Sequence, residues 1–356
     1  MSFDFANPPV SRVTSDLSGV AILLWGANGT GKTPIACGMP KPYYLAFESG
    51  LTGIDGVPYA PMKSWKDFVS FVKWATSPVT TEKAHEICQT VVLDTLDVMA
   101  DYCIDYTCAR FNVSALGETR LNAEGKRDGS INLYTEFGRE FRRQTRALRN
   151  AGFTLVYIAH DGGYRDEVDP KTQQKYTKMY PAGDKRAVEP ICNDVDVIGY
   201  LRANPLDDHG NPVYSTIYFA PNTQYHTRSR YDEIVPLIEH VTANDLCKAI
   251  VAAKQAYLTK HGSQSVTFQE QQAAFQEAPH RSFEEVVSEI GQCVMVIDQY
   301  GMRPEYEAIL EKYLGKGKAG KPKGVQETTP QQLEVLEVIL DEVHDLVAAA
   351  QTKTKE

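Results

Sequence analysis

The 356-residue sequence predicts an α/β fold, in which a mainly parallel β-sheet is flanked by helices. Short, nearly continuous apolar runs alternate with longer helix-like segments, which is typical of strands that are buried on both faces of a sheet. A glycine-rich stretch directly follows the first of these runs, where a strand would pass into a helix. The expected strands cover residues 20–25, 42–47, 90–94, 153–159, 195–201 and 216–220.

The composition is that of an ordinary globular protein, with 42% hydrophobic and 23% charged residues. No apolar stretch approaches the ~20 residues that span a bilayer, and no secretory signal precedes the first strand, so we expect a cytoplasmic protein. The seven cysteines form no C-x-x-C pair, which favours reduced thiols over disulfides or zinc ligands. The net charge of −9 argues against a generally basic surface, but it leaves room for a local basic groove.

The glycine-rich stretch has the spacing G-x-x-x-x-G-K-T of a phosphate-binding loop. Its glycines let consecutive backbone N–H groups turn toward a phosphate chain, and the positive end of the following helix adds to the attraction. In this pattern the lysine reaches the β- and γ-phosphates and the threonine hydroxyl ligates Mg²⁺. The loop consists of Gly26, Ala27, Asn28, Gly29, Thr30, Gly31, Lys32 and Thr33.

Two carboxylates at expected strand ends are candidates for the chemistry at this loop. Asp94 ends a buried strand, where it can hold Mg²⁺-bound water opposite Thr33. The next residue is Thr95 rather than a glutamate, so a catalytic base has to come from elsewhere. Glu48 closes the strand after the phosphate-loop helix and can orient and deprotonate the attacking water if the strands are adjacent. Asp97 competes for this role, but its position favours the start of a helix.

His160 ends the expected strand at 153–159 and is a candidate sensor of the γ-phosphate. A polar side chain at the tip of the strand beside Asp94 can hydrogen-bond the terminal phosphate and report its hydrolysis to the next loop. The sequence places no partner Cys or His at ligand spacing, so a zinc site is not expected.

The polar segment 161–187 interleaves aromatic residues with cations, a combination that suits sequence-tolerant binding of single-stranded DNA. The alternative is a solvated hairpin or an irregular excursion. The predicted DNA contacts are Tyr164, Lys171, Lys175, Tyr176, Lys178, Tyr180, Lys185 and Arg186.

Two further features point to self-association. Arg228 and Arg230 stand two apart after the last expected strand, so they project to one side and can enter a neighbouring subunit's nucleotide site. Surface ion pairs are the alternative for both residues. The sequence Phe3-Asp4-Phe5-Ala6 fits the pattern F-x-x-A, by which some recombinases dock an arm into the next subunit.

The remaining segments define the expected domain organisation. The helix at 133–150 carries apolar residues on one face, and we expect its arginines 139, 142, 143, 146 and 149 to face solvent. Helices are also expected at 241–260, at 282–300 with Ser282 as N-cap, and at 330–349, whereas 264–276 reads as a loose connection. The predicted parts are an arm at 1–18, an ATPase core at 19–240, a helical extension at 241–314, a flexible basic linker at 315–329, and a terminal helix and tail at 330–356.

The ordered set of the phosphate loop, Glu48, Asp94, His160 and Arg228-x-Arg230 resembles RecA-like P-loop ATPases. More narrowly, it is similar to phage nucleotide-binding proteins of the Sak type, which are single-strand-annealing ATPases with a RecA core. The resemblance covers roughly residues 15–240. It implies ATP and Mg²⁺ as cofactors, Glu48 as base, His160 as sensor, and Arg228 and Arg230 as activators in trans.

These observations lead to the expectation of an ATPase that acts on single-stranded DNA in phage-type recombination or replication, in the host cytoplasm, as a ring or filament. The region beyond residue 240 leaves room for a phage or host recombination or replication protein as partner. One alternative is an ATPase that remodels or loads a protein such as a helicase. Another is a nucleotide-dependent switch or scaffold with little hydrolysis. ATP rather than GTP is inferred from the resemblance and from the lack of an N-K-x-D motif.

Overall fold

The computed structural model describes residues 13–48, 50–51, 53–118, 131–211, 213–276, 281–317 and 320–353. The F-x-x-A pattern at residues 3–6 lies outside these ranges. The chain divides into two compact units, the first ending at Phe275 and the second comprising the described residues from Gln276 onward. None of the described helices is long and apolar enough to cross a membrane.

The first unit is built on a nine-stranded sheet with the order β11-β9-β8-β1-β5-β4-β2-β3, in which β10 also pairs with β8. The pairs β1–β5, β1–β8, β4–β5, β2–β4 and β2–β3 are parallel, and the pairs that involve β9, β10 and β11 are antiparallel. The strands are β1 (Ala21–Trp25), β2 (Pro42–Ala46), β3 (Tyr59–Pro61), β4 (Thr90–Asp94), β5 (Thr154–Ala159), β8 (Val197–Arg202), β9 (Thr216–Tyr218), β10 (Arg228–Ser229) and β11 (Leu237–Ile238).

All six expected strands form, and the mainly parallel sheet is confirmed. The reason is visible in β1, where every residue is buried because helices cover both faces of the sheet. Leu23 and Trp25 face one apolar core, and Ile22 and Leu24 face the other. A strand without polar side chains is stable only in such a doubly covered position.

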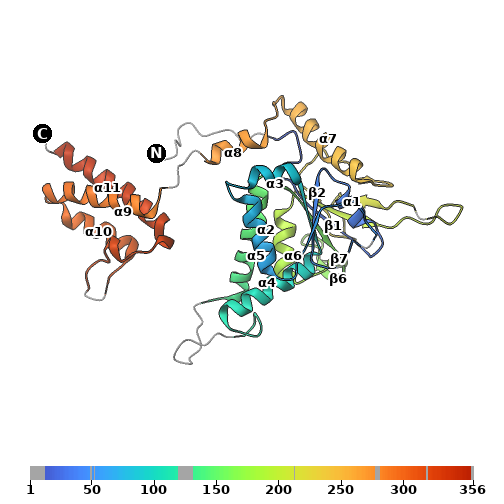
Figure 1. Cartoon of the computed structure of the whole chain (residues 1–356), viewed down its shortest axis with the longest axis horizontal. Coiled ribbons are helices and arrows are strands. Elements are labelled where there is room, and N and C mark those ends of the chain that lie inside the picture. Colours follow the sequence, from blue (N-terminus) through green and yellow to red (C-terminus); the bar gives the residue numbers. More distant parts are fainter. Residues whose placement is uncertain are drawn as a thin grey trace. The chain divides into compact units, whose positions relative to one another are not determined.

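Helices lie on both faces of the sheet (Figure 1). The core that contains Trp25 also contains residues of α2 (Trp65–Thr76), α4 (Leu96–Phe111), α5 (Leu133–Asn150) and α6 (Lys185–Asp194), with α3 (Thr81–Ile87) packed beside α2. The opposite core contains residues of α1 (Lys32–Cys37) and α7 (Ala243–His261). The carboxyl ends of the parallel strands therefore open between two helical layers, at the edge where α1 begins.

Helix α5 forms at the predicted residues, but one of its arginines is not on the solvent side. Arg149 donates hydrogen bonds to the carbonyl of Gly19 and to both carboxylate oxygens of Asp196, at 2.8 and 2.7 Å. Asp196 in turn accepts from the backbone N–H of Ala21 at 2.9 Å. Arg149 thus fixes the start of β1 to the segment before β8, whereas Arg139, Arg143 and Arg146 are exposed.

The second unit contains three helices with a core of their own. These are α9 (Phe283–Gln299), α10 (Arg303–Leu314) and α11 (Leu333–Lys353), joined through the short 3-10 turns Val325–Glu327 and Pro330–Gln332. Buried residues from all three helices meet there, among them Ile290, Leu310 and Leu340. Ser282 caps α9 as predicted, through a reciprocal pair of bonds with Glu285.

The domain boundaries differ from the prediction in two places. Helix α7 packs on α1, so it belongs to the first unit rather than to a separate extension. The predicted linker is not a boundary, because α11 packs on α9 and α10. Lys316 and Pro322 form an isolated antiparallel β-bridge. Residues 264–276 are also not a loose connection throughout, since α8 (Phe268–Gln276) is helical.

Candidate nucleotide site

The phosphate-binding loop connects β1 to α1, as its sequence predicts. Gly26 passes so close to β8 that a Cβ atom there would lie 2.3 Å from the carbonyl oxygen of Leu201, which excludes any other residue. Gly31 caps α1 with a left-handed backbone, at a φ of 79°. The two glycines therefore satisfy different requirements, close approach at one end of the loop and a positive φ at the other.

Lys32 lies against its own loop. Its Nζ donates to the carbonyl oxygens of Gly26 at 2.9 Å and of Ala27 at 2.8 Å. Burial lowers the pKa of Lys32, and the nearby carboxylates of Asp94, Glu48 and Asp161 raise it in part. A buried ammonium held only by carbonyl dipoles gains from an anionic ligand. The loop is therefore suited to a phosphate group.

Asp94 faces the loop from the end of β4, where its side chain is buried. Its Oδ2 accepts hydrogen bonds from the Thr33 hydroxyl at 2.8 Å and from the Tyr44 hydroxyl at 2.7 Å. Burial raises the pKa of Asp94, whereas the hydrogen bonds from Tyr44 and Thr33 and the charges of His160 and Lys32 lower it.

The oxygen donors of Thr33 and Asp94 fit Mg²⁺, which prefers hydroxyl, carboxylate and phosphate oxygens and takes only one or two protein carboxylates. The described residues contain no cluster of three or more His, Cys, Asp or Glu side chains that could hold a metal by themselves. A Mg²⁺ ion that is shared with a nucleotide needs no such cluster.

Glu48 and His160 meet at the same edge, where His160 Nε2 lies 3.3 Å from Glu48 Oε1. Strand β2, which precedes Glu48, pairs with β4 and is separated from β1 by β4 and β5. The condition that this strand lies directly beside the phosphate-loop strand is therefore not met. Glu48 nevertheless lies near Lys32, because the carboxyl ends of the neighbouring parallel strands converge. The expectation that His160 follows a strand beside Asp94 is confirmed.

The structure adds two residues that the sequence did not single out. It also shows the position of Asp97, the alternative candidate for the catalytic base. Tyr44 lies on β2 with no exposed surface and holds Asp94. Asp161 follows His160 and acts electrostatically on Lys32. Asp97 lies in the first turn of α4, as predicted. A tyrosine in a buried strand resembles any core residue in sequence, so only the alignment of β2 with β4 reveals its role.

The segment after His160 folds into a two-stranded antiparallel hairpin, β6 (Asp161–Val168) and β7 (Lys175–Pro181). Alternation along the strands divides the predicted DNA contacts between two faces. The exposed face carries Tyr164 and Lys175, and the half-buried face carries Tyr176, Lys178 and Tyr180. The predicted contacts therefore do not form one continuous surface.

Tyr180 is engaged within the hairpin and is not available to stack on a base. Its hydroxyl donates to Glu167 at 2.7 Å, the Arg165 guanidinium lies 4.6 Å from its ring centroid, and its ring stacks on His226. Burial lowers the pKa of Lys178, and Glu167 raises it in part.

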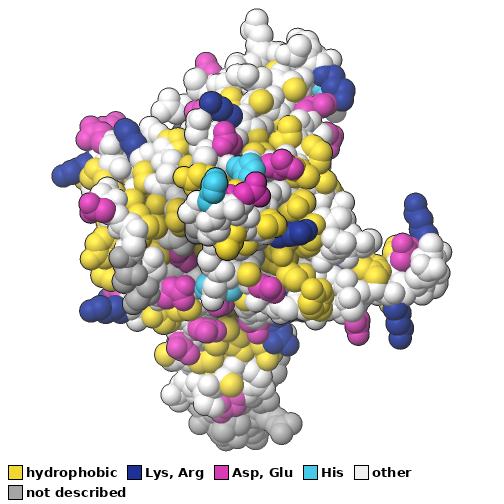
Figure 2. Space-filling view, turned by 90° about the vertical axis from the view of Figure 1, so that its right-hand side faces the viewer, with side chains coloured by type: hydrophobic (Ala, Val, Ile, Leu, Met, Phe, Trp, Pro, Cys, Tyr) yellow, Lys and Arg dark blue, Asp and Glu magenta, His cyan; other side chains and the backbone are white. Residues whose placement is uncertain are grey.

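The other predicted DNA contacts lie apart from these strands. Lys171 is exposed in the turn, outside both strands. Lys185 and Arg186 belong to α6, where Lys185 pairs with Glu189 at 3.3 Å and Arg186 lies 3.4 Å from the ring centroid of Tyr134. Figure 2 shows the side of the molecule that lies to the right in Figure 1. Lys and Arg side chains stand there singly or in small groups among acidic and hydrophobic ones.

The hairpin is attached to the nucleotide edge at its base. The backbone N–H of Ala182 donates to the carbonyl oxygen of His160 at 2.8 Å, so both strands meet at this residue. Met179 accepts a hydrogen bond from the backbone N–H of His226, and the carbonyl of His226 accepts from the Trp25 indole at 2.9 Å. Trp25 is the last residue before the phosphate loop, which gives the hairpin a second link to the site.

Arg228 and Arg230 lie at the opposite, amino edge of the sheet. Arg228 pairs in β10 with the start of β8 and donates to the carbonyl of Cys192 at 3.2 Å. Arg230 donates to the carbonyl of Asn193 and lies 3.3 Å from a carboxylate oxygen of Asp196. Within one chain the two guanidinium groups thus bind the end of α6 and face away from the phosphate loop. Their role across a subunit boundary stays a prediction.

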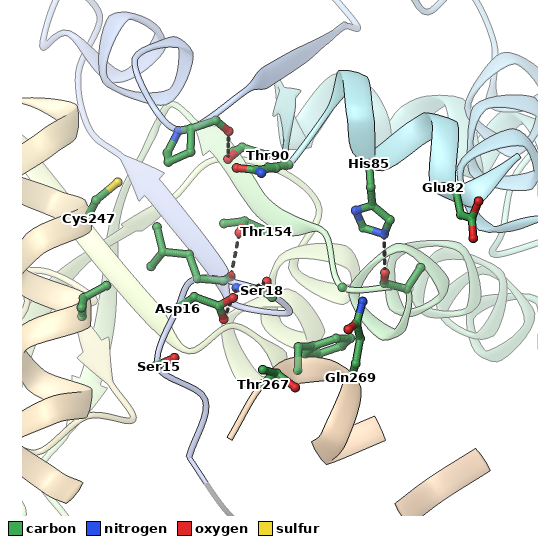
Figure 3. A pocket seen from close by; sticks show the side chains of 17 residues that line it. Ser15, Asp16, Ser18, Glu82, His85, Thr90, Thr154, Cys247, Thr267 and Gln269 are labelled. Atoms are coloured by element: carbon green, nitrogen blue, oxygen red, sulfur yellow. Dashed lines mark hydrogen bonds between the residues drawn. The ribbon is translucent and has the colours of Figure 1, made fainter. Parts of the chain in front are cut away.

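A cavity of about 850 Å³ also lies at the amino edge, distant from the phosphate loop (Figure 3). Several of its polar side chains already have partners. His85 bonds the carbonyl of Ala151, Thr154 bonds that of Leu17, and Ser18 bonds Asp16. Its walls come from the starts of β4 and β5, and none of its lining residues belongs to the nucleotide site. We therefore assign it no part in the chemistry.

Comparisons with known proteins identify the family of the chain. Residues 18–231 match the AAA domain family, a span that contains the phosphate loop, Glu48, Asp94 and His160. Across 350 residues the chain is 34% identical to the SPbeta prophage-derived uncharacterized protein YorG of Bacillus subtilis (strain 168), an alignment that covers 98% of this chain and 100% of that protein. The chain belongs to the AAA domain family of P-loop ATPases.

Proposed function

We propose that this chain hydrolyses ATP and acts on single-stranded DNA in phage-type recombination or replication, as a relative of the Sak-type annealing ATPases. The observation that carries the proposal is the position of His160. Its side chain contacts Glu48 at the nucleotide edge, and its backbone carbonyl anchors the β6–β7 hairpin. A single residue thus links the place where a γ-phosphate would be cleaved to the segment that would hold DNA.

The chemistry proposed for the site is in-line attack of water on the γ-phosphate. Lys32 would exchange its bonds to the loop carbonyls for bonds to phosphate oxygens, and Thr33 and Asp94 would hold Mg²⁺, which would offset phosphate charge. Glu48 takes a proton from the attacking water while the oxygen of that water bonds to the γ-phosphorus. The bond from the γ-phosphorus to the bridging oxygen breaks, which yields ADP and phosphate. His160 donates a hydrogen bond to the terminal phosphate, so the release of this phosphate alters the contact between His160 and Glu48.

The proposed DNA contact is the exposed face of the hairpin. Tyr164 is 69% exposed and belongs to the same face as Lys175, so a base can stack on the ring while the ammonium meets a phosphate. Lys171 in the turn extends the contact along the strand. Tyr176, Lys178 and Tyr180 support this face from behind.

A protein partner is the second candidate, and the charge of the hairpin favours it. Residues 161–181 contain four acidic and four basic side chains, so the segment as a whole does not attract a polyanion. Val168, 48% exposed on the same face as Tyr164, adds an apolar contact. In that case the chain remodels or loads a protein such as a helicase, or serves as a nucleotide-dependent switch with little hydrolysis.

Assembly into a ring or filament is part of the same proposal. A ring or filament would bring Arg228 and Arg230 of one subunit toward the nucleotide of the next, provided that both release the carbonyls at the end of α6. The helical unit beyond Phe275 is the proposed attachment for another recombination or replication protein of the phage or its host.

The hairpin assignment is tested by binding of a fluorescent single-stranded oligonucleotide to the Tyr164→Ala/Lys175→Ala variant. Loss of one stacked base is worth about 1–3 kcal/mol, so affinity is expected to fall about 10- to 100-fold while ATP binding persists. The matched control is Tyr59→Ala/Lys63→Ala, in which the tyrosine is 60% exposed. Equal DNA affinity in both variants and in the unchanged protein would contradict the assignment.

A further inference from the structure

A pocket of about 410 Å³ opens directly beside the phosphate loop. One wall consists of Gly29, Thr30 and Gly31 of the loop together with the first turn of α1. The other wall comes from the β8–β9 connection and from the start of α7. The pocket thus shares its backbone with the loop that would bind phosphates, and it lies on the α1 and α7 side of the sheet.

The second wall of the pocket is fixed in position by backbone and side-chain bonds. Asn204 donates its amide Nδ2–H to the carbonyl of Tyr214 at 2.6 Å, and the backbone N–H of Val241 donates to the carbonyl of Ser215 at 2.9 Å. Thr242 caps α7 through a reciprocal pair with Asp245. These bonds hold Tyr214 beside Asn204 and Ser215 beside the start of α7.

The lining of the pocket is apolar and uncharged, apart from a few hydroxyl groups. Pro34, Ile35, Val213, Val241 and Ala243 provide the apolar surface. Tyr214 is 69% exposed at the rim, which leaves its ring free of the core. None of the lining residues is Asp, Glu, Lys or Arg. A flat aromatic ligand would lose little by leaving water here, whereas a charged group would find no partner.

We infer that this pocket receives the base of the nucleoside triphosphate and that Tyr214 stacks on it. The inference rests on the proposed triphosphate site, because a nucleotide held at Lys32 must direct its base away from Asp94 and Glu48. The pocket begins at loop residues Gly29–Gly31 and continues past Pro34, so it lies in that direction. Stacking and apolar contact distinguish bases weakly, and no carboxylate is present to accept the amide protons of guanine. The pocket therefore tolerates adenine and guanine alike.

The test compares three probes on the full-length protein by calorimetry, namely ATP, GTP and inorganic triphosphate, each with Mg²⁺. ATP and GTP are expected to bind within about tenfold of each other. Tyr214→Ala is expected to weaken both about tenfold, the loss of one stacked ring, and to leave inorganic triphosphate within twofold. Tyr214→Phe keeps the ring and is expected to bind all three as the unchanged protein does. Tyr106→Ala, on α4 beneath the opposite face, serves as control.

The possible failures are distinguishable. Unchanged ATP affinity in Tyr214→Ala would overturn the base pocket while leaving the triphosphate site intact. An equal loss for ATP and inorganic triphosphate would overturn it as well, because the variant would then act through the loop. Failure of the unchanged protein to bind inorganic triphosphate would contradict the triphosphate site itself, and the base pocket with it.

Discussion

At the scale of single residues, the contact between Tyr44 and Asp94 decides how the metal ligand is presented. The hydroxyls of Tyr44 and Thr33 both donate to the same carboxylate oxygen of Asp94. A bound Mg²⁺ ion would break the hydrogen bond from Thr33 first, because the Thr33 hydroxyl would itself be a ligand of the ion. Tyr44 would then be the bond that keeps Asp94 oriented. It acts as a positioning residue, since it contacts the carboxylate and not the nucleotide.

The change Tyr44→Phe removes this bond and leaves the ring in place. A hydrogen bond to a charged group is worth about 1.5–3 kcal/mol, so the Mg²⁺ concentration for half-maximal hydrolysis is expected to rise about tenfold or more. Nucleotide binding without Mg²⁺ is expected to stay the same. Tyr43→Phe is the matched control, because the ring of Tyr43 lies beside Phe71 in the opposite core. An unchanged Mg²⁺ requirement in Tyr44→Phe would show that Asp94 needs no such support.

At the scale of elements, the base of the hairpin is held by a half-buried histidine, His226. Burial, together with the charges of Lys178, Arg165 and Arg228, lowers the pKa of His226 to about 4. The unfolded chain takes up this proton near pH 6.5 and the folded chain only near pH 4. The stability that neutral His226 contributes to the folded state is therefore complete above pH 6.5 and is lost as the pH falls from 6.5 toward 4.

Stability is accordingly expected to drop by about 1–2 kcal/mol between pH 7 and pH 5 through this residue, from 1.36 kcal/mol per pKa unit reduced for partial exposure. His226→Gln should remove that part of the pH dependence. Urea unfolding followed by tryptophan fluorescence measures it, because all three tryptophans (25, 65 and 74) lie in the ATPase unit. Parallel pH profiles for the variant and the unchanged protein would exclude His226 as the source.

Elements differ in how far their sequence predicts them. The six main strands could be predicted because each is mostly apolar, and the phosphate loop because its spacing is specific. Strand β3 has three residues, and β10 and β11 have two each, too few for a period to emerge. The hairpin strands are polar, so the sequence offers a hairpin only as an alternative for this segment. Tyr44, Asp161 and the separation of Tyr164 from Tyr180 depend on strand register, which a single sequence does not specify.

At the scale of the whole molecule, the two units have separate cores. Leu340 of α11 is buried with residues of α9 and α10, and none of these belongs to the two cores that cover the sheet. A charge at this position would have to be buried without a partner or would unfold the small unit. The ATPase unit contains all the residues of the nucleotide site.

Leu340→Asp is therefore expected to abolish the calorimetric transition of the helical unit, at a cost of about 3–5 kcal/mol or more. ATP hydrolysis and tryptophan fluorescence should persist. Val338→Asp changes a neighbouring side chain that is 46% exposed and should leave both transitions in place. Loss of hydrolysis in Leu340→Asp alone would show that the ATPase unit depends on the helices beyond it.

The central claim joins ATP hydrolysis at Glu48 to a DNA strand at the hairpin, and the release of phosphate tests it most directly. The full-length protein with ATP and Mg²⁺ is expected to release phosphate faster when single-stranded DNA is added. Glu48→Gln is expected to slow release about 100-fold or more under both conditions, because removal of a general base costs about 10²–10⁴ in rate. Release that ignores both the DNA and the substitution at Glu48 would contradict the account.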